Sequence, residues 1–290
     1  MDKKYRLLTV FILILGGFIA CKDEAIYTPD EKFVLQAYLY ANEPVTDITI
    51  RYTVPLTVAD TVVGDPVNNA RVILYKNSKS YNLVSSSDSG SYSYQGTDLI
   101  IAAGDVFTIE ATANGKTATG ETSVPEAPSG VMLSNDTIQF PEVTVNQSGP
   151  PDFSKMQELM QMQRDVQLDV VWDNPKGLLH FVVIENAEEN QVSIFPQPGG
   201  NFGQIRNRGA FRQISKPTRE SSYQINFGDI QYWGKYIVKV YRVNQEYADL
   251  YDNLQQDSRD LNEPPTNIKN GQGIFSAFNS QNVYFEVVKK

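Results

Sequence analysis

The sequence has few of the side chains that build covalent cross-links, metal sites and acid–base catalysts. Among 290 residues there is one cysteine, Cys21, and one histidine, His180. A single cysteine excludes an intramolecular disulfide, so the fold must be held by its hydrophobic core. One histidine without a second thiol leaves too few ligands for the common zinc sites. Ser-His-Asp or Cys-His catalysis would have to use His180, the one histidine, as its base.

Other catalytic and binding motifs are missing as well. There is no Gly-x-x-x-x-Gly-Lys-Ser/Thr phosphate loop and no Asp-x-Asp-x-Asp-Gly calcium loop, and the glycines at 199–203 lack a strand-to-helix setting. His180 stands in an apolar strand pattern, which favours a core or surface histidine over a ligand or base. We therefore predict no catalytic residue, no metal and no cofactor. A carboxylate-dependent hydrolase is the remaining enzymatic alternative, although no two acids stand out.

Positive charge is also scarce. The chain has 25 Lys and Arg against 34 Asp and Glu, a net charge of −9. Without residues 1–20 the balance is 22 to 33, or about −11. A nucleic-acid partner is disfavoured, because such proteins present a basic face to the phosphate backbone.

The only long apolar run is Leu7–Ile19, which follows Lys3, Lys4 and Arg6. It is shorter than the roughly 20 residues of a membrane-spanning helix, and basic residues before such a run indicate a secretory signal peptide. A small residue directly before Cys21 resembles the lipobox of bacterial lipoproteins. This resemblance implies a signal peptide over 1–20, a mature chain beginning at an acylated (palmitate-type) Cys21, and attachment to membrane lipid.

The residues after the cysteine form an acidic tether over 21–32. Its start, Lys22-Asp23-Glu24, resembles the export signal that sends lipoproteins of the Bacteroidota type to the outer surface of the outer membrane. The alternative is a solvated linker whose charges have no role.

From residue 33 the pattern is that of an all-β domain, predicted over 33–126. Phe33–Tyr40 alternates apolar and polar positions, and Asn114-Gly115 is a strong hairpin signal. Short strands with turns between them favour a β-sandwich. Pro125 and Pro128 are predicted to close the domain. Further strands are expected at 48–52, 70–76, 91–95 and 105–113.

A second β-rich domain is predicted over 131–290, with two short helices. The first helix is expected at 154–164, where a methionine cluster favours local core packing over a docking face. The second is expected at 245–256, where Tyr247, Leu250, Tyr251 and Leu254 share one face. Trp172 is predicted to be a core residue between sheets. Strands are expected at 166–172, 178–185, 223–227, 235–243 and 283–288.

Residues 195–219 combine phenylalanines with arginines in an otherwise acidic chain. Arginine and aromatic side chains are typical of protein interfaces. The alternative is a mobile hairpin tip whose charges aid solubility. We call residues 195–219 the Phe/Arg segment. The candidate partner-binding residues are Phe202, Arg206, Arg208, Phe211 and Arg212.

Two groups of motifs carry a family resemblance. Near the end of the chain stand Tyr247-x-x-x-Tyr251, Asn262-Glu263-Pro264-Pro265 and the run from Asn267 to Phe275; near its start stand the runs 35–39, 43–48 and 53–56. Together these resemble the lipoproteins grouped as domain of unknown function family 4249. The resemblance implies an immunoglobulin-like or transthyretin-like N-terminal β-sandwich, a second β-rich domain and association with TonB-dependent outer-membrane transporters. It implies no catalytic residue.

We therefore expect a non-enzymatic, surface-exposed outer-membrane lipoprotein that serves as an accessory or binding subunit beside a transporter protein. The alternative is a structural or adhesive cell-surface lipoprotein, in which one β-domain is a spacer and the other binds the ligand.

Overall fold

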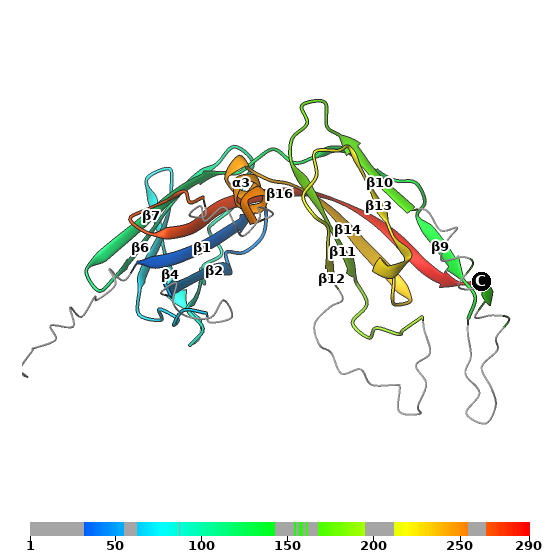
Figure 1. The fold of residues 1–290 in the computed structure, drawn as a ribbon, viewed down its shortest axis with the longest axis horizontal. Helices are drawn as coiled ribbons and strands as arrows, with labels where there is room; N and C mark the ends of the chain where they lie inside the picture. Colours follow the sequence, from blue (N-terminus) through cyan, green and yellow to red (C-terminus); the bar gives the residue numbers. More distant parts are fainter. Residues whose placement is uncertain are drawn as a thin grey trace, which may run out of the picture. The chain divides into compact units, whose positions relative to one another are not determined.

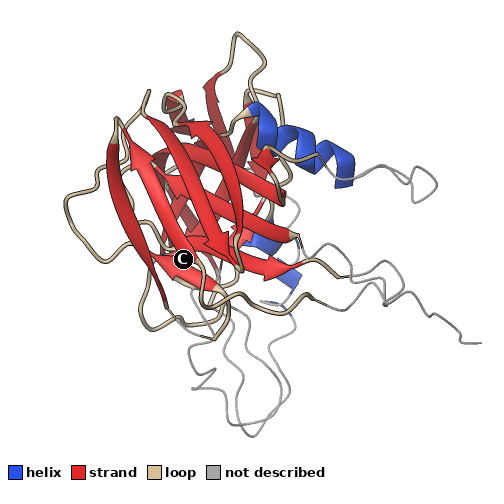
Figure 2. Cartoon of the chain, turned by 90° about the vertical axis from the view of Figure 1, so that its left-hand side faces the viewer, coloured by secondary structure: helices blue, strands red, loops and turns tan. Residues whose placement is uncertain are grey.

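The computed structural model describes residues 32–54, 63–86, 88–142, 168–194, 212–254 and 265–290, with isolated positions between 154 and 161. Residues 32–290 form one compact unit. Its strands belong to a 13-stranded and a 3-stranded sheet (Figure 1), and Figure 2 shows how strongly they dominate the described fold. The prediction of a mostly β protein is confirmed.

The first seven strands are β1 (Phe33–Tyr40), β2 (Asp47–Tyr52), β3 (Arg71–Lys76), β4 (Lys79–Ser85), β5 (Ser91–Ser93), β6 (Val106–Ala113) and β7 (Lys116–Ser123). The others are β8 (Ser129–Leu133), β9 (Thr137–Phe140), β10 (Leu168–Asp173), β11 (His180–Asn186), β12 (Arg212–Ile214), β13 (Ser222–Ile225), β14 (Gly234–Arg242), β15 (Ile268–Lys269) and β16 (Gln272–Lys289). One turn of 3-10 helix, η2, covers Phe227–Asp229, and the helix α3 covers Gln245–Leu254.

The first sandwich has one layer in the order β16–β1–β2–β5–β4 and a second in the order β4–β3–β6–β7–β15. The alternation in β1 predicted its inward face: Phe33, Leu35, Ala37 and Leu39 are all buried in the first core. The Asn114-Gly115 turn is also confirmed, since both residues have positive φ, as a two-residue hairpin of this type requires.

Strand β4 was not predicted from the sequence. It begins at a second turn with two positive φ angles, at Asn77 and Ser78. Serine gives a weaker turn signal than glycine at such a position, because a side chain disfavours the left-handed conformation. The hairpin was therefore missed although its strands pair regularly.

The second sandwich packs the layer β12–β11–β14–β16–β9 on the three-stranded layer β13–β10–β8. The chain changes layer between β8 and β9. A three-stranded layer packed on a larger layer with additional strands at its edges is the arrangement of an immunoglobulin-type sandwich. Trp172 lies in the core between the layers with 3% of its surface exposed, as predicted.

Strand β16 belongs to both sandwiches. Gln272–Phe278 pairs in parallel with β1, and Asn279–Val287 pairs antiparallel with β14. The sequence predicted only the stretch 283–288, because polar residues such as Ser276 and Asn279 interrupt the apolar pattern. Their side chains have partners: Ser276 Oγ donates to Glu246 Oε1 at 3.4 Å, and Asn279 Nδ2 donates to the Pro125 carbonyl at 2.9 Å.

The division into domains at 33–126 and 131–290 stays a prediction. The first core also contains Ile268, Phe275 and Ala277 from near the end of the chain. The two sandwiches therefore depend on the same C-terminal strand.

A third cluster, here called the junction cluster, lies where β1, β11, β14, β16 and α3 meet. Its buried members are Leu179, Phe181, Val183, Tyr241, Val243, Ala248 and Phe278, and the half-buried Tyr38, Tyr40 and Tyr247 pack against them. The predicted second helix is thus confirmed over 245–254, and its Ala248 is fully buried. The helix expected at 154–164 lies largely outside the described residues. Within the described part of the chain, no helix combines the length and apolar character needed to span a bilayer.

Candidate partner-binding face at strand β12

The structure describes only one of the predicted functional side chains. Cys21, Lys22, Asp23 and Glu24 lie outside the described residues, and so do Phe202, Arg206, Arg208 and Phe211. Arg212 is described. It lies within the Phe/Arg segment as the first residue of β12, and β12 is the last strand of its layer.

Arg212 belongs to an ion triad on the outer face of this layer. Strand pairing sets Arg212 opposite Glu185, and Arg212 Nε lies 3.1 Å from Glu185 Oε1. Lys239 on β14 places its Nζ 3.1 Å from Glu185 Oε2. Two cations on one carboxylate leave one positive charge in excess, in a chain whose net charge is −9.

The triad orients Arg212 more than it stabilises the fold. The Arg212 side chain is 46% exposed, and ion pairs at such exposure contribute about 0–1 kcal/mol. The guanidinium retains donors for a partner, and Ile214 on the same strand adds an apolar side chain that is 54% exposed. Arginine beside exposed apolar surface suits a protein interface.

The triad lies close to the junction cluster. Tyr40 donates its hydroxyl proton to Asp47 Oδ2 at 3.1 Å, and burial together with Asp47 raises the pKa of Tyr40. Burial and the nearby Glu43 raise the pKa of Tyr241 to about 12. The positive charge of Arg212 acts on both hydroxyls in the opposite direction, towards a lower pKa. Strand β12, within the Phe/Arg segment, therefore starts beside the contact between the two sandwiches.

His180 is a core residue, the first of the two alternatives, core or surface, that the sequence left open. It is 2% exposed, its ring lies 5.4 Å from that of Trp172, and its Nδ1 is 2.9 Å from the Leu178 carbonyl. A carbonyl only accepts, so Nδ1 carries the proton and donates. Burial lowers the pKa of His180, with a contribution from Arg242, its partner on β14.

This environment predicts a loss of stability in mild acid. The unfolded chain binds a proton at His180 more readily than the folded chain, so the free energy of unfolding should fall as the pH drops below about 6.5. We expect the urea midpoint to decrease between about pH 8 and pH 5.5, and to decrease less in His180→Gln. An equal decrease in both proteins would show that other groups are responsible.

Among the described residues, no three His, Cys, Asp or Glu side chains gather as a metal site would need.

Residues of the C-terminal motif have structural roles. Asn267 Oδ1 accepts from Phe275 N at 2.8 Å, and its Nδ2 donates to the carbonyls of Phe275 at 2.7 Å and Glu121 at 3.2 Å. Asn270 has a φ of 58° and Gly273 a φ of 108°. These residues shape the β15–β16 turn and fix it to β7, which the sequence pattern alone did not indicate.

Several solved structures are similar to this chain. Two fibronectin type III domains of chicken tenascin align over 89% of this chain and 99% of theirs, at 12% identity and a TM-score of 0.23. The FN1–FN3 domains of chicken CNTN1 align over 88% of this chain and 64% of theirs, at 10% identity and a TM-score of 0.25. No curated protein matches the sequence. The model of a family described as "Domain of unknown function (DUF4249)" matches residues 22–282, so the chain belongs to the DUF4249 family.

Proposed function

We propose that the protein is a non-enzymatic outer-membrane lipoprotein, exposed at the cell surface, that serves as an accessory binding subunit of a TonB-dependent transporter. The signal-like segment, Cys21 and the tripeptide after it support the anchor and the export. Support for the binding role comes from the Arg212 triad, which places excess positive charge on an exposed strand of the Phe/Arg segment.

The route of the chain is consistent with a binding head at a distance from its anchor. The chain that begins at Cys21 enters the first sandwich at Phe33, and β1 then runs to Tyr40 in the junction cluster. The second sandwich therefore joins at the opposite end of β1 from the tether. The first sandwich is a spacer in this proposal, and the second presents the Arg212 face.

Anchoring is tested by Cys21→Ser and membrane fractionation. The wild type should sediment with membranes and the variant should not. Protease added to intact cells should digest the wild-type protein, because the proposal places it outside. Membrane association and processing that are unchanged in Cys21→Ser would contradict the anchor.

Partner binding is tested by purification from membranes in mild detergent, where the wild type should recover a transporter barrel. We expect Arg212→Glu to weaken this association at least about tenfold, corresponding to about 1.4 kcal/mol, because it reverses the charge offered to the partner. Lys176→Glu makes a comparable reversal at an exposed turn and should have little effect. Recovery of wild-type protein without any barrel would count against the transporter role.

The adhesive alternative has one observation in its favour. The single strand β16 runs from Gln272 to Lys289 through both sandwiches and would carry force along the chain. Deletion of the protein separates the two functions: loss of uptake of a nutrient supports the transporter role, and loss of attachment supports adhesion.

A further inference from the structure

The end of the first sandwich where the tether enters is built from four separate parts of the chain. We call it the tether end. Strand register brings Phe33 at the start of β1 beside Tyr52 at the end of β2. Asn114 at the tip of the β6–β7 hairpin donates to the Tyr52 hydroxyl at 2.8 Å. A Cβ added to Gly271, in the β15–β16 turn, would lie 3.2 Å from the Phe33 carbonyl. In Figure 1 the hairpin tip and the start of β1 lie at the same end of this sandwich.

Basic residues gather at the tether end. Among the described residues, the bases there are Lys32, Arg51, Arg71, Lys116 and Lys269, and the acids are Asp65, Asp88 and Glu110. All of the bases except Arg51 are exposed. Within the described residues, no ion pair engages Lys32, Arg71 or Lys269. The bases thus outnumber the acids among the described residues of this end, in a chain whose net charge is −9.

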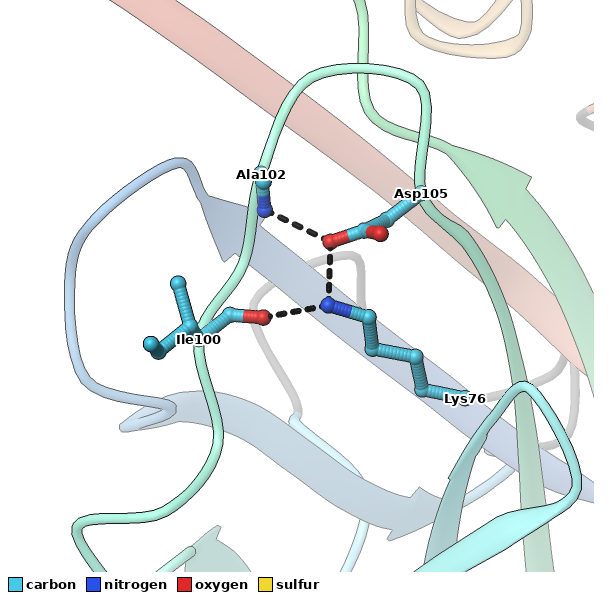
Figure 3. A network of polar contacts seen from close by, with 4 residues as sticks. All are labelled: Lys76, Ile100, Ala102 and Asp105. Atoms are coloured by element: carbon cyan, nitrogen blue, oxygen red, sulfur yellow. Dashed lines mark hydrogen bonds and ion pairs between the residues drawn. The ribbon is translucent and has the colours of Figure 1, made fainter.

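The opposite end of the same sandwich has the reverse balance. Lys76 Nζ pairs with Asp105 Oδ2 at 2.5 Å and donates to the Ile100 carbonyl at 2.7 Å (Figure 3), while Lys79 pairs with Asp98 at 2.7 Å. Asp105 Oδ2 also accepts from the Ala102 amide at 2.7 Å. Two further acids, the exposed Glu43 and Asp47, lie in the β1–β2 connection and at the start of β2. The first sandwich is therefore polarised along β1, with its positive end at the tether.

An exposed apolar residue accompanies the bases. Val63 is 68% exposed, the largest exposure among the large hydrophobic side chains of the described residues. It lies at the tether end, since Arg51 Nη1 donates to the carbonyl of the next residue, Gly64, at 3.2 Å. The Tyr52 amide donates to the Asp65 carbonyl at 2.9 Å. Apolar and basic side chains together are the composition of surfaces that lie on lipid bilayers.

We propose that the tether end rests on the membrane surface, where its lysines and Arg71 contact anionic lipid headgroups and Val63 reaches the headgroup boundary. The inference rests on the acyl anchor of the proposed function, because each single contact is weak. The tether between Cys21 and Lys32 spans at most about 40 Å, so the anchor keeps this end near the bilayer. The acidic opposite end then faces away from the membrane.

The test uses residues 22–290, which carry neither signal peptide nor acyl chain but contain every described residue of the three clusters. Sedimentation is measured with phosphatidylcholine vesicles, with and without about one third phosphatidylglycerol. The protein should partition onto the anionic vesicles alone, and less so as salt is raised.

Two variants locate the contact. Lys32→Gln/Arg71→Gln/Lys269→Gln should lower the partition coefficient roughly 100-fold, since each base near an anionic surface contributes about fivefold. The matched control, Lys176→Gln/Lys216→Gln/Lys235→Gln, removes three exposed lysines from the second sandwich and should bind like the wild type. Circular dichroism in the near ultraviolet confirms that both variants are folded.

Several outcomes would overturn the proposal: equal binding to both vesicle types, equal losses in the two variants, or binding that disappears when the chain starts at Lys32. That shorter chain lacks the acidic tether and should bind the anionic vesicles at least as well. This experiment needs no acyl group and no transporter. If the protein does not bind the vesicles, this inference is contradicted but the acyl anchor at Cys21 is not. If the anchor is contradicted by Cys21→Ser, the vesicle result is unaffected.

Discussion

Gly273→Val should lower the free energy of unfolding by about 4 kcal/mol or more, or prevent folding altogether. Gly273 pairs with Leu35 where β16 joins β1, and its φ of 108° is one that side chains rarely allow. A Cβ at this position would lie 2.1 Å from the Leu35 carbonyl oxygen and 2.8 Å from its carbonyl carbon. Because these are backbone atoms in a paired strand, relief requires separating β1 from β16. Soluble yield and urea unfolding measure the effect.

Gly104→Ala provides the control for this substitution. Gly104 also has a positive φ, of 81°, but no atom lies within 4 Å of an added Cβ. Its cost should be limited to backbone strain, roughly 1–2 kcal/mol. If both substitutions had the same effect, the close approach of β1 and β16 would not be the cause. Gly273→Ala tests the same contact with the smallest possible side chain, should valine give no folded protein.

Phe278→Ala should cost about 3–5 kcal/mol, the range for removing a buried aromatic side chain. Phe278 is 2% exposed. Its ring centroid lies 5.3 Å from that of Tyr40, 5.7 Å from Phe181 and 5.0 Å from Tyr247, so it contacts β1, β11 and α3 at once. The loss should also uncouple the two sandwiches. We expect two unfolding transitions in urea where the wild type has one.

Tyr284→Ala is the matched control on the same strand. Tyr284 is 62% exposed, and its removal should change stability by no more than about 0.5 kcal/mol. Phe278→Leu should restore most of the loss, because it refills the cavity. A small effect of Phe278→Ala with a single transition would show that the junction cluster does not couple the two cores.

The candidate site was predictable only in part. The mixture of phenylalanine and arginine before β12 marked Arg212 as a possible contact residue. The sequence could not indicate Glu185 and Lys239 as its neighbours, because their proximity depends on the order β12–β11–β14. Nor could it indicate that Tyr40 and Tyr241 lie near the same charge.

The strands, too, were predictable from the sequence only in part. The strand β1 was identified with its observed bounds because it is apolar at every second position and faces one core. The strand β16 was identified over only six of its 18 residues. Its middle carries serine and asparagine side chains whose hydrogen-bond partners, Glu246 and the Pro125 carbonyl, come from distant segments.

The sequence by itself determined what depends on near neighbours: the inward face of β1, the Asn114-Gly115 turn, the helix at 245–254 and the burial of Trp172. Only the tertiary structure decided that one C-terminal strand completes both sandwiches. It also decided that Lys32, Arg71 and Lys269 meet at one end of the first sandwich. The physical reason is that alternation and turn geometry are local properties, whereas strand order and register are chosen by long-range pairing that brings together residues remote in the chain.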